Sequence, residues 1–93
     1  MLFRSVIVAT EQASQKIFFF TSIDGRNGQT IYHRWLYQGN PVGIQALAIG
    51  SDHWRTYSLK TIPADWTGSW AVEVLDSEHK LVASYPFIHQ TAK

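Results

Sequence analysis

Apolar and polar residues alternate along most of this chain in short runs, and turn-forming residues separate one run from the next. The clearest run covers residues 29–37. Its alternate positions form two sets, with Ile31, His33, Trp35 and Tyr37 on one side and Tyr32, Arg34 and Leu36 on the other. Residues 69–76 repeat the pattern with Trp70, Val72 and Val74 on the apolar side. A period of two residues is typical of half-buried β-strands.

The same periodicity, followed along the whole chain, predicts strands over residues 3–9, 16–23, 29–37, 42–49, 53–59, 69–76 and 80–88. Glycine, proline, asparagine and aspartate mark the turns at residues 24–28, 38–41, 50–52 and 76–79, and a loop at 61–68. Residues 10–15 are polar and fit either a loop or a short helical turn. The three phenylalanines at 18–20 predict that both faces of the second strand are covered. Pro86 predicts an edge or a bulge in the last strand.

Short strands at such regular spacing are typical of an antiparallel β-sandwich, and we expect one of about seven strands with an immunoglobulin-like or fibronectin-like arrangement. A small closed barrel is the alternative. The chain has 93 residues and no cysteine, so we expect one domain over residues 1–93, stabilised by buried apolar area rather than by disulfides. Large aromatic rings supply such area, and Trp35 and Trp70 are expected in the core.

Composition excludes several classes of function. Eight basic and seven acidic residues give a formal charge of +1, so we expect no nucleic-acid partner. The absence of cysteine removes disulfides, thiolate metal sites and a cysteine nucleophile. No run approaches the ~20 apolar residues of a membrane helix, and the start of the chain lacks the apolar core of a signal peptide. Localisation is left open, because an extracytoplasmic or membrane-associated protein would need such a segment outside this chain.

Catalytic and metal-binding patterns are missing. Ser51, Asp52 and His53 are the residue types of a triad, but neighbours on a strand point to opposite faces. The seven carboxylates are scattered and the four histidines lack ligand spacing, so we expect no enzyme, no cofactor and no metal site. His33 shares its face with Ile31 and Trp35, which favours a hydrogen-bonded core histidine over a ligand. Residues 24–28 fit a plain turn better than a calcium loop.

Aromatic and basic residues lie near one another on two of the predicted strands. Tyr32 and Arg34 share the polar face of the third strand, and Arg55 and Tyr57 lie together on the fifth. One interpretation is structural, with guanidinium groups stacked on rings of neighbouring strands. The other is a platform of rings for a sugar or a peptide, with the arginines holding an anionic group. Trp66 belongs to the 61–68 loop and either closes the end of the sandwich or stands exposed.

Several motifs resemble the family known as the bacterial domain of unknown function 2914. The likeness runs from about Lys16 to Phe87 and rests on these positions: Phe20, Thr21, Gly28, Ile31, His33, Arg34, Trp35, Trp54, Arg55, Ser58, Gly68, Trp70, Val72, Leu81 and Phe87. Residues 1–15 do not match clearly, and the turn at 76–80 lacks an expected glycine. The resemblance implies an accessory module, commonly placed behind membrane-spanning segments, and it implies no activity.

Three functions follow as hypotheses. The first is a non-catalytic interaction module of a bacterial protein that contacts a protein partner or a preceding membrane domain, with free strand edges that allow a homodimer. The second is a carbohydrate-binding module, with Tyr32, Tyr57 or Trp66 contacting a glycan. The third is a hydrolase-like enzyme, which requires a deep pocket with a polar pair of shifted pKa.

Overall fold

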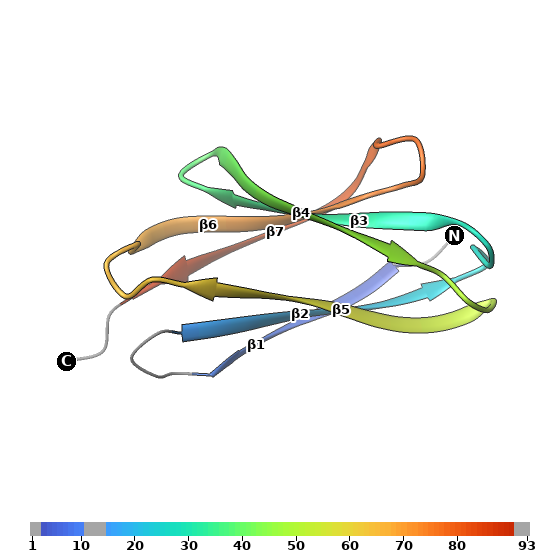
Figure 1. The fold of residues 1–93 in the computed structure, drawn as a ribbon, viewed down its shortest axis with the longest axis horizontal. Coiled ribbons are helices and arrows are strands. Elements are labelled where there is room, and N and C mark those ends of the chain that lie inside the picture. Colours follow the sequence, from blue (N-terminus) through green and yellow to red (C-terminus); the bar gives the residue numbers. More distant parts are fainter. Residues whose placement is uncertain (1–2, 11–14, 91–93) are drawn as a thin grey trace.

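The structure is a computed structural model that describes residues 3–10 and 15–90, with side chains from residue 16 onward. The described chain is built from seven strands (Figure 1): β1 (Phe3–Thr10), β2 (Gln15–Asp24), β3 (Thr30–Tyr37), β4 (Asn40–Ala48), β5 (His53–Ile62), β6 (Gly68–Leu75) and β7 (Leu81–His89). The described residues contain no helix, and hence no helix that could cross a membrane.

The strands form two antiparallel sheets stacked as a sandwich, as predicted (Figure 1). Sheet A has the order β1-β2-β5, and sheet B has the order β4-β3-β6-β7. In the constant-type immunoglobulin sandwich the fourth strand lies in the sheet of the first, second and fifth strands. Here β4 pairs with β3 instead. This exchange leaves sheet A with β1 and β5 as its edges.

Predicted and observed strand limits differ most around the fifth strand. We expected it to end at residue 59, but β5 continues to Ile62, directly before Pro63. The loop expected over 61–68 is therefore shorter, because β6 already begins at Gly68. Pro86 lies in β7, which is an edge strand as predicted. The interior of the expected 10–15 loop or helical turn, residues 11–14, lies outside the described residues.

Two tight turns place non-glycine residues in the left-handed backbone region. Gln38 (φ 50°) and Gly39 (φ 84°) connect β3 and β4 with the two positive φ angles of a type I′ hairpin. His79 (φ 65°) occupies the left-handed position in the glycine-free turn between β6 and β7. The Asp76 carboxylate supports that turn by accepting the backbone N–H groups of Lys80 (2.9 Å) and Glu78 (2.8 Å). These hydrogen bonds lower the pKa of Asp76.

The core lies between the two sheets and is rich in aromatic rings. Trp35 and Trp70 are buried there, with 2% and 1% of their surfaces exposed, which confirms the prediction for both. Phe19 extends from sheet A towards sheet B, where its ring centroid lies 6.4 Å from that of Trp35 and 5.4 Å from that of Tyr85. Residues from both sheets complete the core: Ile17, Ile23, Ile31, Leu47, Ile62, Val72 and Val74.

His33 is the polar centre of this core and has the role predicted for it. Its side chain is fully buried and both ring nitrogens have partners, Nδ1 with Ser58 Oγ at 2.7 Å and Nε2 with Thr21 Oγ1 at 3.3 Å. The Thr21 hydroxyl also donates to the carbonyl oxygen of Thr56, which can only accept. Thr21 Oγ1 is then the acceptor of an Nε2–H group, and Nδ1 accepts from Ser58. Burial lowers the pKa of His33 to about 4, so the imidazole is neutral at pH 7.

Candidate functional site

The outer surface of sheet A carries a group of apolar side chains that face away from the core. Phe20 is paired with Tyr57 and Phe18 with Leu59 in the β2–β5 register. Residues directly opposite each other in a sheet point to the same side, so these four side chains form one surface across the two strands. We call Phe18, Phe20, Tyr57 and Leu59 the aromatic face.

The three rings of the aromatic face are in mutual contact. Phe18 and Phe20 have centroids 6.2 Å apart and planes only 13° from parallel. Tyr57 lies 6.1 Å from Phe18 and 5.6 Å from Phe20, tilted by about 40° to each. The rings support one another without a covering layer, since 39% of Phe20, 53% of Tyr57 and 40% of Leu59 are exposed.

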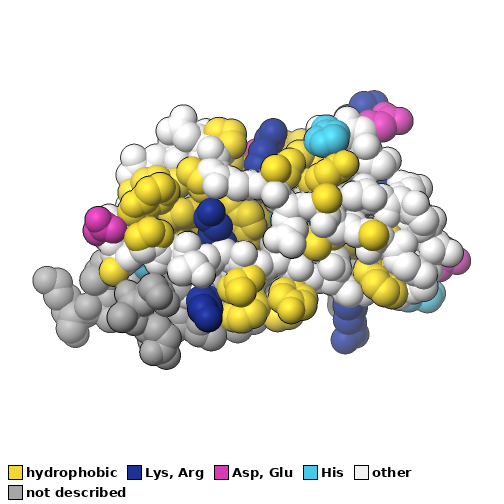
Figure 2. All heavy atoms as spheres, in the orientation of Figure 1, with side chains coloured by type: hydrophobic (Ala, Val, Ile, Leu, Met, Phe, Trp, Pro, Cys, Tyr) yellow, Lys and Arg dark blue, Asp and Glu magenta, His cyan; other side chains and the backbone are white. Residues whose placement is uncertain are grey.

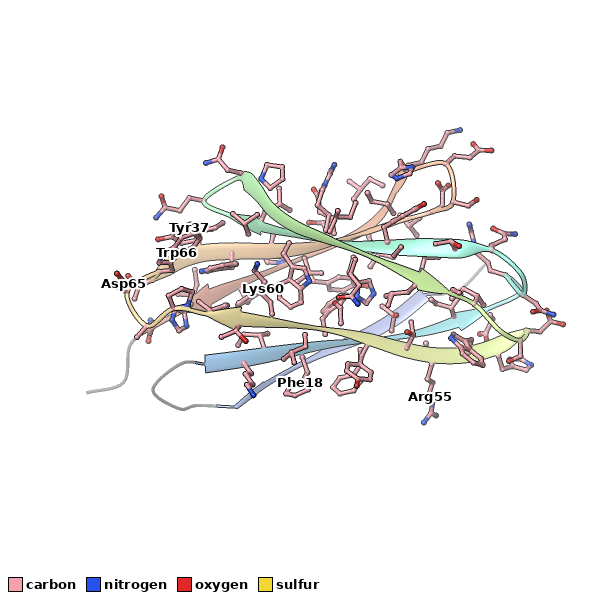
Figure 3. The ribbon with its side chains drawn as sticks, viewed as in Figure 1. Phe18, Tyr37, Arg55, Lys60, Asp65 and Trp66 are labelled. Atoms are coloured by element: carbon pink, nitrogen blue, oxygen red, sulfur yellow. The ribbon has the colours of Figure 1, made fainter. Side chains whose placement is uncertain are left out.

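Cationic side chains flank the aromatic face. Lys16 and Arg55 are exposed and lie on the same side of sheet A, because they pair with Thr61 and Ser22 in the same alternation. Figure 2 shows hydrophobic surface along the lower rim of the molecule with a basic side chain to either side. In Figure 3, Phe18 and Arg55 point away from sheet B. Arg55 makes no hydrogen bond or ion pair with the part of the chain that the structure describes.

The carboxylate on this side of β2 is already paired. Asp24 Oδ1 lies 2.8 Å from Nδ1 of His53, its partner in the β2–β5 register. Asp24 is therefore engaged at the end of the strands, and Arg55 carries an unneutralised charge beside Tyr57. The aromatic face thus combines exposed rings, one tyrosine hydroxyl and positive charge.

Two of the predicted site residues, Arg55 and Tyr57, belong to this surface, whereas Tyr32 and Arg34 lie on the opposite side of the molecule. Those two side chains project from the outer surface of sheet B, so the structure does not bring the two pairs together. Tyr32 stacks on His79, with ring centroids 4.2 Å apart. Arg34 donates from Nε (2.8 Å) and Nη2 (2.5 Å) to Oε1 of Glu73. Its guanidinium thus has a carboxylate partner in place of the stacked ring of the structural interpretation.

This difference predicts unequal effects of removing the two arginines. Arg34→Ala is expected to lower the free energy of unfolding by about 1 kcal/mol, because it leaves the largely buried Glu73 carboxylate without its ion pair. Arg55→Ala is expected to change it by less than about 0.5 kcal/mol. Urea unfolding followed by circular dichroism measures both. Glu73→Gln is the matched control for Arg34, and equal effects of the two arginine variants would contradict this assignment.

A family model covers residues 28–88, which is more than half of the 93-residue chain. The chain belongs to the family described as "Protein of unknown function (DUF2914)". No curated protein and no solved structure matches it.

The motifs that resemble the DUF2914 family are mostly core positions in the structure. Seven of these motif residues are buried: Thr21, Ile31, His33, Trp35, Ser58, Trp70 and Val72. They include His33 and its two hydrogen-bond partners, Thr21 and Ser58. Within the aromatic face, the family match covers Tyr57 and Leu59, while Phe18 and Phe20 precede its first residue. The resemblance therefore describes how this fold is packed and assigns no role to the exposed surface.

Trp66 lies at one end of the sandwich and combines the two interpretations offered for it. Its ring stacks on Tyr37 with centroids 5.0 Å apart, and its backbone carbonyl accepts Nε1–H of Trp70 at 3.0 Å (Figure 3). These contacts close the end of the core. The remaining 39% of the residue is exposed. Trp66 lies in the loop between β5 and β6 and its ring contacts Tyr37 and Trp70, so it does not extend the aromatic face.

Metal-ligating residues do not converge in the described part of the chain: no three His, Asp or Glu side chains there are placed to hold one ion. Ser51 and His53 are linked only through a hydrogen bond from Ser51 Oγ to the His53 carbonyl. His53 instead directs its ring at Asp24. The residues 24–28 form the predicted turn, with Gly25 (φ 76°) and Gly28 (φ 86°) in the left-handed region.

Sequence reasoning missed the two phenylalanines of the site. We predicted that both faces of the second strand are covered, which is wrong for the outer face at Phe20. The buried side of β2 is formed by Ile17, Phe19, Thr21 and Ile23, and the exposed side by the residues between them. Lys16, at the start of the exposed side, could have indicated this arrangement from the sequence, since a charged residue at one end of a strand marks the side that faces water.

Proposed function

We propose that this domain is a non-catalytic interaction module that holds a protein partner on the aromatic face. The observation that carries the proposal is the contiguous exposure of Phe20, Tyr57 and Leu59 on neighbouring strands. Aromatic residues and arginine are the side chains most enriched at the energetic centres of protein interfaces. Contiguous exposed apolar patches on small domains commonly mark such contacts.

The charges around the aromatic face define the chemistry of the partner. Lys16 and Arg55 flank the rings, and the carboxylate on the same side of β2, Asp24, is paired with His53. A complementary surface therefore presents apolar side chains for the rings and a carboxylate for Arg55. Arg55 offers a planar fork that binds a carboxylate with two parallel hydrogen bonds.

The outer surface of sheet B supports such docking less well. Ile44, Leu81 and Ile88 are exposed there, but they lie on the edge strands β4 and β7. The central strands β3 and β6 carry the Arg34–Glu73 ion pair between them. These aliphatic side chains are thus separated by charge, and Ile88, at 63% exposed against 39% for Phe20, provides a more accessible control position.

A carbohydrate ligand is the second candidate, favoured by the near-parallel planes of Phe18 and Phe20. Sugars stacked on rings also need hydrogen-bonding groups around them. On this side of sheet A such groups are the Tyr57 hydroxyl inside the aromatic face and, around it, the side chains of Lys16, Ser22, Arg55 and Thr61. A protein partner can bury the phenylalanine and leucine side chains of the aromatic face more fully than a sugar can.

Site-specific photo-crosslinking tests the proposal. A benzoylphenylalanine in place of Phe20 is expected to give a discrete adduct with another protein in cells that make the full-length protein, whereas the same group at Ile88 gives none. Adding Arg55→Glu is expected to abolish the adduct. With the captured partner purified, Arg55→Glu is expected to weaken binding by about tenfold or more.

Three results would overturn the proposal: no adduct at Phe20, equal adducts at both positions, or an adduct insensitive to Arg55→Glu. A glycan array provides the remaining arm. Binding of a glycan that Tyr57→Ser removes would replace the protein partner by a carbohydrate.

A further inference from the structure

β5 is an edge of sheet A with an uninterrupted backbone. It contains ten residues without proline, and its pairing with β2 has no register shift. The edges of sheet B differ, since β4 contains Pro41 and β7 contains Pro86, and each has a register shift against its neighbour. Proline, bulges and charged side chains, lysine above all, commonly protect an edge against pairing with another strand. β5 has no proline and no bulge, and its lysine, Lys60, donates to the Val42 carbonyl of its own chain.

The hydrogen-bond pattern shows which backbone groups of β5 point to the free edge. Gly25 N–H donates to the Asp52 carbonyl at 2.8 Å, immediately before the pair Asp24–His53. Hydrogen-bonded and non-hydrogen-bonded pairs alternate along an antiparallel ladder. The residues of non-hydrogen-bonded pairs turn their N–H and C=O groups away from β2, and in β5 these are His53, Arg55, Tyr57, Leu59 and Thr61.

Two side-chain contacts agree with this alternation. The carbonyl of His53 accepts the Ser51 hydroxyl at 2.8 Å, as expected of a group that does not face β2. The carbonyl of Thr56, in the other set, accepts the Thr21 hydroxyl of β2. No described residue forms a hydrogen bond with the edge groups of Arg55, Tyr57, Leu59 or Thr61. Two of these residues, Tyr57 and Leu59, also belong to the aromatic face.

We infer that β5 pairs with β5 of a second copy of this chain in an antiparallel arrangement, with Tyr57 of each copy opposite Leu59 of the other. Arg55 then lies opposite Thr61. Four such pairs, each exchanging two backbone hydrogen bonds, supply about eight hydrogen bonds between the copies. The pairing joins the two three-stranded sheets into one continuous sheet.

The self-complementarity of β5 identifies a second copy as the occupant. In this register an aromatic ring meets an aliphatic chain twice, and no like charges are opposed, which is favourable for cross-strand pairs. A shift of the two-fold axis to Tyr57 places Arg55 opposite Leu59 and loses this match. The cation on the inner side is Lys60, whose Nζ lies 3.3 Å from the Val42 carbonyl of its own chain (Figure 3).

Pairing along β5 brings the aromatic faces of both copies side by side on one sheet. The dimer forms through edge backbone groups and does not require the partner protein of the proposed function. It makes the domain bivalent, so a partner with two docking segments gains apparent affinity without new contacts.

Sedimentation velocity over a concentration series tests the inference on the full chain. The parent is expected to reach the mass of two chains as the concentration rises. Leu59→Pro removes one N–H donor at the free edge and is expected to stay monomeric at concentrations where Leu59→Ala still dimerises. Circular dichroism verifies that both variants keep the strand signal, because proline is tolerated where its N–H would face solvent.

A charge exchange tests the register independently of proline. Tyr57→Glu alone and Leu59→Lys alone are each expected to raise the dimer dissociation constant by about tenfold or more. Combining the two substitutions places the introduced carboxylate of each copy opposite the introduced ammonium of the other. This double variant is expected to restore dimerisation to within about threefold of the parent.

A parent that stays monomeric at all concentrations would overturn the inference, as would a double variant that dimerises no better than the single ones. Equal dimerisation of Leu59→Pro and Leu59→Ala would also overturn it. The Phe20 crosslink reports separately on the proposed function, because an adduct with another protein and an adduct with a second copy differ in mass.

Discussion

Replacing Trp70 with alanine is expected to lower the free energy of unfolding by about 3–5 kcal/mol, the range for large aromatic side chains removed from a core. Trp70 is 1% exposed, and its ring centroid lies 4.8 Å from that of Tyr37 and 6.2 Å from that of Phe87. The substitution removes these contacts, leaves a cavity and deprives the Trp66 carbonyl of its indole donor. The total free energy of unfolding of a small domain is only about 5–15 kcal/mol. Urea unfolding followed by far-ultraviolet circular dichroism measures the loss.

Trp66→Ala is the matched control for Trp70→Ala, because it removes the same residue type from the same cluster at a position that is 39% exposed. We expect its effect to be less than half as large. Trp35→Ala, which removes a second buried ring that contacts Phe87, should resemble Trp70→Ala. For a domain of this size a loss of about 3 kcal/mol corresponds to a decrease in Tm on the order of 12 °C or more. A decrease below about 4 °C for Trp70→Ala would show that its ring does not support the core.

The architecture was largely accessible from sequence because two strands with clear alternation fix the inner side of sheet B. Ile31, Trp35, Trp70 and Val72 identify the buried side of β3 and β6, and His33 follows from its position among them. Turn residues then limit the remaining strands. The placement of β4 beside β3 was not accessible, because alternation specifies which side of a strand is buried but not which strand lies next to it.

Only half of the candidate site could be predicted from the sequence, for the same reason. Arg55 and Tyr57 stood out as a basic-aromatic pair within one strand, whereas Phe18 and Phe20 join them through pairing between β2 and β5. Such pairing connects residues that are far apart along the chain, and the pattern of residues within one strand does not show which strand it pairs with. Arg34 is a second example, since its carboxylate partner Glu73 comes from β6, and the interpretation of Arg34 as stacked on a neighbouring ring did not include this pairing.

The inner and outer sides of sheet A thus contribute to different properties. Phe19 and Thr21 of β2 pack against His33 and hold the two layers together, while their neighbours Phe18 and Phe20 are left for contacts with other molecules. Both sets alternate on one strand, so the contacts of His33 lie on the opposite side of β2 from the aromatic face. Protonation of the buried His33 places a charge inside this core.

The free energy of unfolding is expected to fall by about 3 kcal/mol as the pH is lowered from about 6.5 to about 4, because of His33 alone. The folded chain holds the pKa of His33 at about 4, whereas the ordinary value of 6.5 applies to the unfolded chain. Above pH 6.5 the imidazole is neutral in both states and contributes no pH dependence. Between these two pKa values His33 is protonated in the unfolded chain and neutral in the folded chain, so lowering the pH favours unfolding. Below about pH 4 both states are protonated and the loss due to His33 is complete.

Urea unfolding at a series of pH values between about 7 and about 4.5, with His33→Gln as the matched variant, isolates this contribution. Glutamine retains one donor and one acceptor for Ser58 and Thr21 but does not titrate. The difference between the parent and the variant should shrink as the pH falls, because only the parent loses stability through this group. The backbone N–H of Lys80 lowers the pKa of Asp76, so this carboxyl titrates below its ordinary value of 3.8 and outside the pH range of the experiment. Parallel pH profiles for the two proteins would show that His33 is already protonated, or accessible to water, in the folded state.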